Sequence, residues 1–216
     1  MRKNSKAVIV VGMHRSGTTA MMGCLELMGV SLGSGRRSLN ENLELQRVND
    51  LILRSYGSSW RDGSLDKPSL KNKRVNDKFV ARIKNIIEKD FGKANIFSFK
   101  DPRLSLLLPI YKRALNELGI KDRKFIFMRR PADQVAKSLL RRDRMLEELT
   151  LKLYSKYVGR TKEGLVGEKF IEVDFGKMLE NMDLLKMVYT TIFNKNMEED
   201  IMKSIESFLN PKLKHF

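Results

Sequence analysis

The stretch VIVVGMHRSGTT, residues 8–19, decides the fold of this chain. Residues 7–11 form an uninterrupted apolar run, typical of a strand buried on both faces of a parallel sheet, and residues 20–28 continue at helical spacing. Between these segments, Gly12 and Gly17 bracket four residues. A loop of this kind directs backbone N–H groups and the positive end of a helix dipole at an anion, so the stretch predicts a phosphate-binding loop.

The cation of this loop stands in a different place from that of an ATP-binding loop. Walker-type loops follow the second glycine with a lysine that reaches the β- and γ-phosphates, whereas here that position is Thr18 and the cation is Arg15. We therefore expect the loop to bind a phosphate-like anion other than ATP. Its candidate binding residues are Gly12, His14, Arg15, Ser16, Gly17, Thr18 and Thr19.

The length and composition predict one domain that spans residues 1–216. Hydrophobic residues make up 42% of the chain, which is enough for a full-sized core. A transmembrane helix needs a run of about 18 apolar residues, which is absent, and MRKNSK at the start lacks a signal-peptide pattern, so we expect a cytoplasmic protein. The single cysteine, Cys24, excludes an internal disulfide bond, and with only two histidines a cysteine- or histidine-rich metal site is also excluded.

The net charge of +16 predicts an anionic partner, because a basic protein attracts anions through a long-range field. Nucleic acid, an anionic lipid surface and anionic small molecules or polysaccharides all fit this description. Basic residues crowd residues 67–84, but aromatic residues do not recur there at intervals that stack nucleobases. We therefore expect a solvated helix face in this region and no nucleic-acid partner.

The remaining chain predicts strands that alternate with helices. Three further β-rich runs lie at residues 95–99, 124–128 and 170–173. Helical patterns follow at residues 104–118, 131–146 and from 178 onward. We therefore predict an α/β fold with a P-loop-like parallel sheet of four to five strands, helices on both faces and a ligand at the carboxyl ends of the strands. Residues 57–73 are a candidate lid, residues 159–167 a second loop, and residues 194–216 a terminal amphipathic helix and basic tail that dock on the domain.

A second anion site is predicted in FIFMRRPADQVAKSLLRRD, residues 125–143. Arg129 and Arg130 end a buried strand, and Ser138 follows in the next helix. An arginine offers a bidentate fork and a serine a hydrogen bond to a phosphate near the top of the sheet. The alternative is that these arginines only pair with surface carboxylates.

A third group of polar residues lies in FKDPRLSLLLP, residues 99–109, where Lys100, Asp101 and Arg103 follow another strand. The carboxyl ends of parallel strands share one edge, so we expect these side chains near the phosphate-binding loop. Asp101 either takes part in the chemistry or caps the helix that starts at Pro102.

Together these segments resemble the sulfotransferases that use 3′-phosphoadenosine-5′-phosphosulfate (PAPS), particularly bacterial glycan-modifying members. GMHRSGTT resembles the family's 5′-phosphosulfate loop, with Arg15 at the position of the catalytic lysine of cytosolic members. MRRPADQVAKS resembles the 3′-phosphate motif, and KDPR is similar to a segment that places a lysine, here Lys100, beside the transferring group. SLNENLELQRVNDLIL, residues 38–53, resembles the acidic segment that carries the base in many bacterial relatives.

The resemblance implies transfer of a sulfuryl group from PAPS to a hydroxyl or amine of a carbohydrate or lipid-linked sugar, with 3′-phosphoadenosine-5′-phosphate (PAP) as product and no metal. Arg15 and Lys100 would neutralise the leaving oxygen, and Glu41 would be the base, with Glu44 and Asp101 as alternatives. Glu41 could instead be a first-turn acid of the helix that runs to Leu53. The basic composition favours an anionic small-molecule or glycan acceptor. Other functions compatible with the sequence are a P-loop phosphotransferase and a nucleotide- or polyanion-binding module without catalysis.

The sequence departs from the family at three points. In most members the helical serine follows the arginine by eight residues; Arg130 meets this spacing to Ser138 but Arg129 meets the spacing to the proline, so the choice between them stays open. The catalytic histidine of the cytosolic members has no counterpart, which is why the base is expected to be a carboxylate. The glycine-rich cofactor segment near the C-terminus is also missing.

Overall fold

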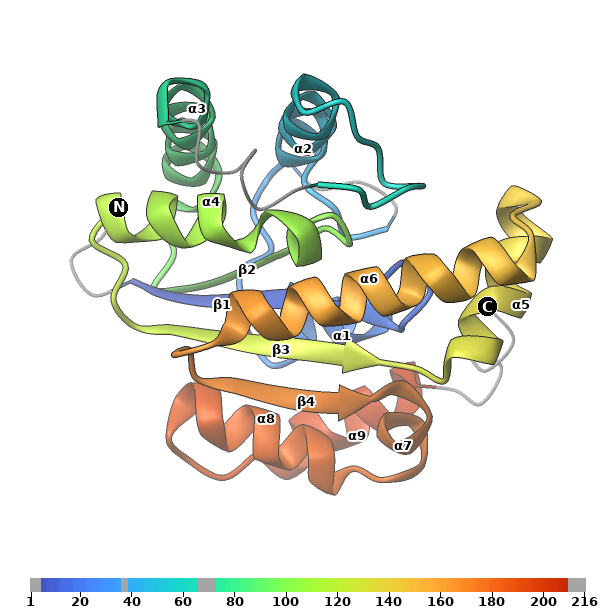
Figure 1. Cartoon of the computed structure of the whole chain (residues 1–216). Helices are drawn as coiled ribbons and strands as arrows, with labels where there is room; N and C mark the ends of the chain where they lie inside the picture. Colours follow the sequence, from blue (N-terminus) through green and yellow to red (C-terminus); the bar gives the residue numbers. More distant parts are fainter. Residues whose placement is uncertain (1–4, 36–38, 66–72, 210–216) are drawn as a thin grey trace.

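The computed structural model describes residues 5–35, 39–65 and 73–209. Within these residues, strands and helices alternate along the chain (Figure 1). The strands are β1 (Lys6–Val11), β2 (Ile96–Lys100), β3 (Arg123–Arg129) and β4 (Phe170–Asp174). The helices are α1 (Thr18–Leu27), α2 (Leu43–Ser55), α3 (Lys73–Phe91), α4 (Leu104–Glu117), α5 (Ala132–Asp143), α6 (Glu147–Leu165), α7 (Phe175–Glu180), α8 (Asp183–Phe193) and α9 (Glu199–Phe208). All four predicted strands are confirmed.

The strands form one parallel sheet in the order β2-β1-β3-β4. Val10 of β1 lies beside Lys100 of β2 on one side and Ile126 of β3 on the other. The chain passes from β1 to β2 at one side of the sheet and then to β3 at the other, so a topological switch point lies at the carboxyl end of β1. Open parallel sheets bind their ligands at such a point, and here the glycine-rich loop follows it.

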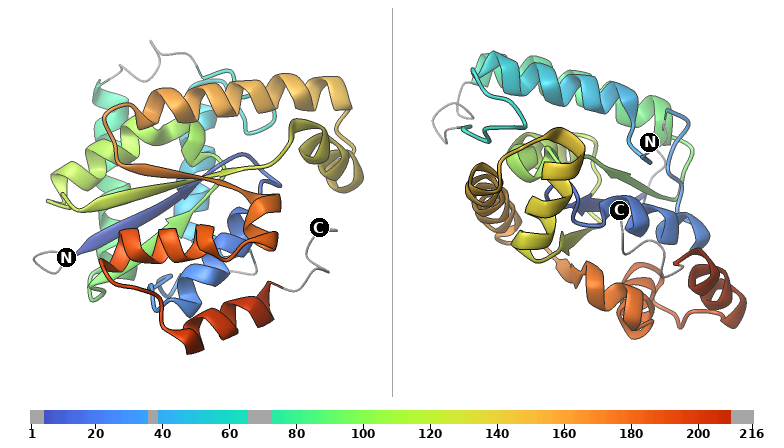
Figure 2. Two further views of the ribbon diagram at one scale, coloured as in Figure 1. Left: turned by 90° about the horizontal axis from the view of Figure 1, so that it is seen from below. Right: turned by 90° about the vertical axis from the view of Figure 1, so that its right-hand side faces the viewer.

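Helices cover both faces of the sheet, as predicted (Figure 1; Figure 2, left). Ala7, Ile9 and Val11 of β1 belong to a core shared with α2, α3, α4 and α6. Val8 and Val10 belong to a second core, shared with α1, α7, α8 and α9. Side chains alternate along a strand and both faces are covered, so every residue of the run has to be apolar. The predicted α/β fold is therefore confirmed.

The region between β3 and β4 differs from the prediction. The helix expected over residues 131–146 ends at Asp143, and the loop expected at residues 159–167 is wrong, because α6 continues through Leu165. Leu153, Tyr157 and Leu165 bury one face of α6 in the core, and this packing outweighs the low helix propensity of the two glycines. Gly164 is required by the approach of α4, since a Cβ added there would lie 2.6 Å from Cδ1 of Leu108.

Replacing Gly164 by alanine is expected to lower the free energy of unfolding by about 1–3 kcal/mol, because the added methyl group overpacks the contact with Leu108. The matched control is Gly159→Ala in the same helix, where the added Cβ meets no described atom within 4 Å beyond its chain neighbours and the helix's own nearby backbone. That variant is expected to be more stable than the wild type by about 0.5–1 kcal/mol, since alanine is the better helix former. Urea unfolding measures both changes, and changes of the same sign would contradict the packing described.

The C-terminal helix α9 docks on α1, as predicted. Ile205 is fully buried, and a Cβ added to Gly23 of α1 would lie 2.3 Å from the Phe208 ring. The absence of a side chain at Gly23 thus makes room for Phe208. The basic tail at residues 210–216 lies outside the described residues.

The first half of the candidate lid is attached to α6. Tyr157 donates its hydroxyl hydrogen to the carbonyl oxygen of Trp60 (3.0 Å), Lys156 donates to that of Asp62 (2.9 Å), and Arg160 donates to that of Leu65 (2.5 Å). Residues 66–72 lie outside the described residues. A lid formed by residues 57–73 stays a prediction, and its described part is held at three points.

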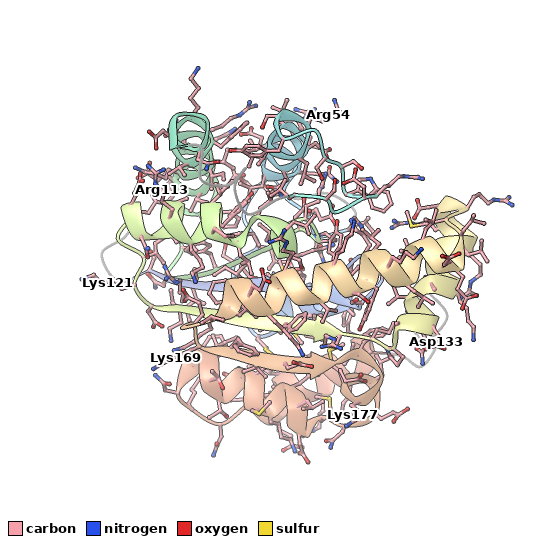
Figure 3. All side chains as sticks on the ribbon, viewed as in Figure 1. Arg54, Arg113, Lys121, Asp133, Lys169 and Lys177 are labelled. Atoms are coloured by element: carbon pink, nitrogen blue, oxygen red, sulfur yellow. The ribbon has the colours of Figure 1, made fainter. Side chains whose placement is uncertain are left out.

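Basic side chains lie on the outer surface of several elements. Arg54 and Lys121 extend from the edge of the molecule (Figure 3). In α3, Lys78 and Arg82 are exposed on a helix whose other face is buried, which confirms a solvated face for the described part of residues 67–84. Among the described helices, none is long and apolar enough to cross a membrane.

Candidate active site

The phosphate-binding loop is pressed against two neighbouring segments. Gly12 has φ +150°, and a Cβ added there would lie 2.6 Å from the carbonyl oxygen of Met128 in β3. Gly17 has φ +87°, and an added Cβ would lie 2.2 Å from the ring of Phe175 at the start of α7. Only glycine combines these backbone angles with so close an approach. The two predicted loop glycines are therefore required by the packing of the loop.

The residues between the two glycines have unusual conformations and surroundings. Ser16 Oγ and His14 Nε2 are buried, and neither has a hydrogen-bond partner among the described residues. Arg15 has a left-handed φ of 68°, which a residue with a side chain rarely adopts. Its Nε donates a hydrogen bond to Ser138 Oγ of α5 at 2.7 Å. The Arg15 side chain thus connects the loop to the second predicted anion site.

A cavity of about 470 Å³ opens beside this loop. The loop follows the carboxyl end of β1, at the edge of the sheet that faces the viewer in Figure 2, right. Five predicted loop residues line it: His14, Arg15, Gly17, Thr18 and Thr19. Gly12 and Ser16 are buried within the loop and do not line it. The other predicted site residues on its wall are Glu41, Lys100 and Arg130. The fold thus brings all three predicted segments to one cavity.

Lys100 and Glu41 form a buried ion pair in this cavity. Lys100, the last residue of β2, is 3% exposed, and its Nζ lies 2.6 Å from Glu41 Oε1 and 3.2 Å from Thr19 Oγ1. Gln46 Nε2 donates a hydrogen bond to the other Glu41 oxygen at 3.0 Å. Burial lowers the pKa of Lys100, and the Glu41 carboxylate opposes this shift. A candidate cation, a candidate base and the phosphate-binding loop are therefore in direct contact.

The position of Glu41 argues against its being a first-turn helix acid. Asn42 caps α2 by accepting a hydrogen bond from the backbone N–H of Leu45 at 3.0 Å, so Glu41 precedes the helix. The first-turn acid is Glu44, whose Oε1 lies 2.5 Å from Lys89 Nζ on the neighbouring helix α3. Of the two glutamates, only Glu41 lines the cavity.

Asp101 forms a buried ion pair with Arg103. Its Oδ1 accepts hydrogen bonds from the backbone N–H and the Nε of Arg103, both at 2.8 Å, and its Oδ2 accepts one from Nη2 at 2.6 Å. Arg103 also pairs with Asp50 of α2. Burial lowers the pKa of the Arg103 guanidinium, but Asp101 and Asp50 raise it above its usual value. Asp101 therefore binds the backbone N–H of Arg103, the residue before α4, and neutralises the buried arginine, and it does not line the cavity.

The two arginines after β3 lie in different surroundings. Arg130 is 7% exposed and lines the cavity, where its Nη1 donates to the backbone carbonyl oxygen of Arg15 at 3.4 Å. Arg129 donates from Nε to the hydroxyl of Tyr154 at 3.2 Å and lies 3.3 Å from Glu172. It lines a separate cavity of about 660 Å³ that Arg130 also borders. Of the two, only Arg130 shares a cavity with the phosphate-binding loop.

The His14 ring lies beside two aromatic rings and close to several cationic side chains. Its ring centroid lies 4.5 Å from that of Trp60 and 6.1 Å from that of Tyr157. Burial is the main cause that lowers its pKa well below the ordinary value, and Arg103 and Arg142 lower it further. The imidazole is therefore neutral at physiological pH. Among the described residues, no group of three or more His, Cys, Asp or Glu side chains is arranged to hold a metal ion.

Several lining residues were not predicted from the sequence. They are Ala20, Leu39, Asn40, Pro102, Arg142, Phe175 and Phe208. A signal for Arg142 exists, because it follows Ser138 by four residues and so shares its helix face. Phe175 directly follows β4, at the edge of the sheet where a ligand is expected. Phe208 has no local signal, since the packing of α9 on α1 brings it there.

Comparisons with known proteins find a likeness in fold among solved structures. No protein-family model matches the sequence, and no curated protein matches it either. Among solved structures, the sulfotransferase STF1 from Mycobacterium tuberculosis aligns over 94% of this chain and 71% of its own, with a TM-score of 0.55 and 10% identity. The sulfotransferase domain from the curacin biosynthetic pathway aligns over 91% of this chain and 76% of its own, with a TM-score of 0.55 and 13% identity.

A retinol dehydratase in complex with androsterone and the inactive cofactor PAP aligns more weakly, over 94% of this chain and 64% of its own, with a TM-score of 0.49 and 14% identity. The two stronger alignments each cover more than nine-tenths of this chain. This chain has the fold of the sulfotransferases.

Proposed function

We propose that the protein is a sulfotransferase that moves a sulfuryl group from PAPS to a hydroxyl or amine of a carbohydrate or lipid-linked sugar. The observation that carries the proposal is the single cavity lined by the phosphate-binding loop, the Lys100–Glu41 pair and Arg130. Sulfuryl transfer, like phosphoryl transfer, needs placement and charge neutralisation more than covalent help from the protein. This cavity offers both.

The loop residues fit a bound phosphate group. Ser16 Oγ and His14 Nε2 are two of the three buried side-chain polar atoms without a partner in the described part of the chain. Buried polar groups in folded proteins are nearly always hydrogen-bonded, so two unpartnered atoms within one short loop favour a ligand there. The left-handed residues Arg15 and Asn40 both line the same cavity, and backbone strain of this kind concentrates at ligand sites.

The cations of the cavity fit the two ends of the nucleotide. We assign the 5′-phosphate to the loop N–H groups with Thr18 and Thr19, and the 3′-phosphate to Arg130 and Ser138. Arg15 lies between these regions, because its side chain starts in the loop and contacts Ser138. Burial, followed by Arg142 and Arg130, lowers the pKa of the Arg15 guanidinium, so an anion among these cations would be stabilised.

When bound, the donor supplies the sulfuryl group, which forms a bond to the acceptor oxygen or nitrogen as its bond to the 5′-phosphate oxygen breaks. Glu41 accepts the proton of the acceptor. Lys100 and Arg15 neutralise the charge that grows on the departing phosphate oxygen. Lys100 already contacts both Glu41 and the loop hydroxyl of Thr19, so it lies between the base and the phosphate site.

The acceptor class is inferred from the sequence resemblance, the charge and the exposed apolar side chains of the cavity. The resemblance of residues 12–19 and 38–53 to bacterial glycan-modifying members favours a sugar, and the net charge of +16 favours an anionic one. Leu39 and Phe208 are 48% and 40% exposed on the wall of the cavity, which fits a partly apolar acceptor such as a lipid-linked sugar. The cytoplasmic location expected from the sequence stays a prediction.

Calorimetric titration with PAP, ADP and ATP without Mg²⁺ tests the proposal. We expect PAP to bind more tightly than ADP or ATP, because Arg130 and Ser138 recognise its 3′-phosphate. Arg15→Ala and Ser138→Ala are each expected to weaken PAP binding by about tenfold, the scale of one lost hydrogen bond to a charged group. Ser155→Ala, an exposed serine on α6, is the control. Equal or tighter binding of ATP, or no binding of PAP, would contradict the proposal.

A further inference from the structure

Arg142 lies on the wall of the cavity but has no role in the site described so far. It follows Ser138 by four residues on α5, and residues at this spacing lie on the same face of a helix. Its Nε donates a hydrogen bond to Asp143 Oδ2 at 2.6 Å. Within the described part of the chain, neither of its two terminal nitrogens has a hydrogen-bond partner. The ion pair with Asp143 thus uses Nε alone, and the two terminal nitrogens can donate hydrogen bonds to a ligand.

The surroundings of Arg142 are strongly cationic. Arg15, which contacts Ser138, and Arg130 line the same cavity. After burial, Arg142 is the largest cause that lowers the pKa of Arg15, and it also lowers that of His14. Guanidinium groups gathered around one cavity repel one another, and an anion of more than one charge would relieve that repulsion. Of the carboxylates around these groups, Asp143 pairs with Arg142 and Glu41 pairs with Lys100.

We propose that Arg142 is a specificity-determining residue that binds the 3′-phosphate of the nucleotide together with Ser138 and Arg130. This inference rests on the proposed function. The sequence motif predicts a 3′-phosphate site of one arginine and one serine, and Arg142 adds a second guanidinium to it. The two terminal nitrogens of an arginine can donate hydrogen bonds to two phosphate oxygens at once, whereas a serine hydroxyl donates to one. Ser138 and Arg142 would therefore contact one phosphate from adjacent turns of α5.

The inference is tested by the difference in affinity between PAP and AMP, which differ only in the 3′-phosphate. Calorimetry on the wild type, Arg142→Ala and Arg141→Ala measures the ratio of the two dissociation constants. We expect Arg142→Ala to weaken PAP binding by about tenfold or more while AMP binding changes little. Arg141→Ala removes the same charge from the preceding residue, which acts on Arg130 and Arg15 through its field but does not line the cavity, so this variant is expected to change the ratio much less than Arg142→Ala. Circular dichroism melts check that the variants are folded.

The outcomes separate this inference from the proposed function. If the wild type does not prefer PAP to AMP, the nucleotide site itself is wrong and the proposed function fails. If the wild type prefers PAP and Arg142→Ala leaves the ratio unchanged, only the role of Arg142 is overturned. An equal loss for PAP and AMP, or the same loss in Arg141→Ala, would also overturn it, because such a loss reports a general field and not a contact with the 3′-phosphate.

Discussion

Replacing Glu41 by glutamine is expected to lower kcat by about 10²- to 10⁴-fold, the contribution of a positioned general base. Glutamine has nearly the same size, and its amide oxygen can still accept the hydrogen bond from Lys100. Its amide nitrogen can donate to the Gln46 side-chain oxygen once the Gln46 amide turns over, so PAP binding is expected to change little. The measurement is PAP release from PAPS with a panel of amino sugars and oligosaccharides, with each variant compared on the acceptor that the wild type uses fastest.

The same variant predicts a change in pH dependence. Burial lowers the pKa of Lys100 and Glu41 opposes it, so loss of the carboxylate lowers that pKa further. A lysine with a lower pKa loses its proton at a lower pH, and with it the charge that neutralises the leaving oxygen. The residual activity of Glu41→Gln is therefore expected to decline at a lower pH than the wild-type activity as pH rises.

Glu44→Gln is the matched control, because Glu44 lies three residues away, pairs with Lys89 and does not line the cavity. It is expected to keep the wild-type kcat. If Glu41→Gln keeps full activity, or if both variants lose it equally, Glu41 is not the base. If no acceptor supports turnover by the wild type, a binding module without catalysis is favoured instead.

Replacing Asp101 by alanine is expected to lower the free energy of unfolding by about 3–5 kcal/mol, the cost of leaving one partner of a buried ion pair alone. Asp101 and Arg103 are 3% and 4% exposed, and three hydrogen bonds join them. Without Asp101, the Arg103 guanidinium would keep only Asp50, whose side chain is 41% exposed. Urea unfolding at neutral pH measures the loss.

The control is Asp77→Ala, which removes a carboxylate that pairs with Arg113 at the surface. Solvent screens such a pair, so the stability of this variant is expected to stay close to that of the wild type. A stability loss in Asp101→Ala no larger than that in Asp77→Ala would show that the Asp101–Arg103 pair does not support the fold. It would also reopen Asp101 as a candidate base.

The fold could be read from the sequence because its signals are local. The apolar run of β1 has to be buried on both faces, and the glycines after it serve a loop that closes against β3 and α7. This strand, loop and helix follow one another in the sequence, so the pattern of consecutive residues predicts their type and order. The same holds for the other three strands, whose β-rich runs each end at the same edge of the sheet.

The tertiary structure decided which candidate side chains share the cavity, because their partners come from distant segments. Arg129 and Arg130 are adjacent in sequence, yet successive residues of an extended chain point in opposite directions, and only Arg130 turns to the phosphate-binding loop. Glu44 pairs with Lys89, and Asp101 pairs with Arg103. Of the three candidate bases, only Glu41 pairs with Lys100.

Packing also overrode local propensity. Two glycines in α6 predict a loop, but the buried face of the helix, which includes Leu153 and Tyr157, stabilises it, and α4 packs closely against Gly164. Phe208 reaches the cavity only because α9 docks on α1. The sequence by itself thus determined the sheet, the phosphate-binding loop and the list of candidate residues, since these depend on neighbours along the chain. Only the tertiary structure decided which of those residues meet, because burial and charge pairing depend on neighbours in space.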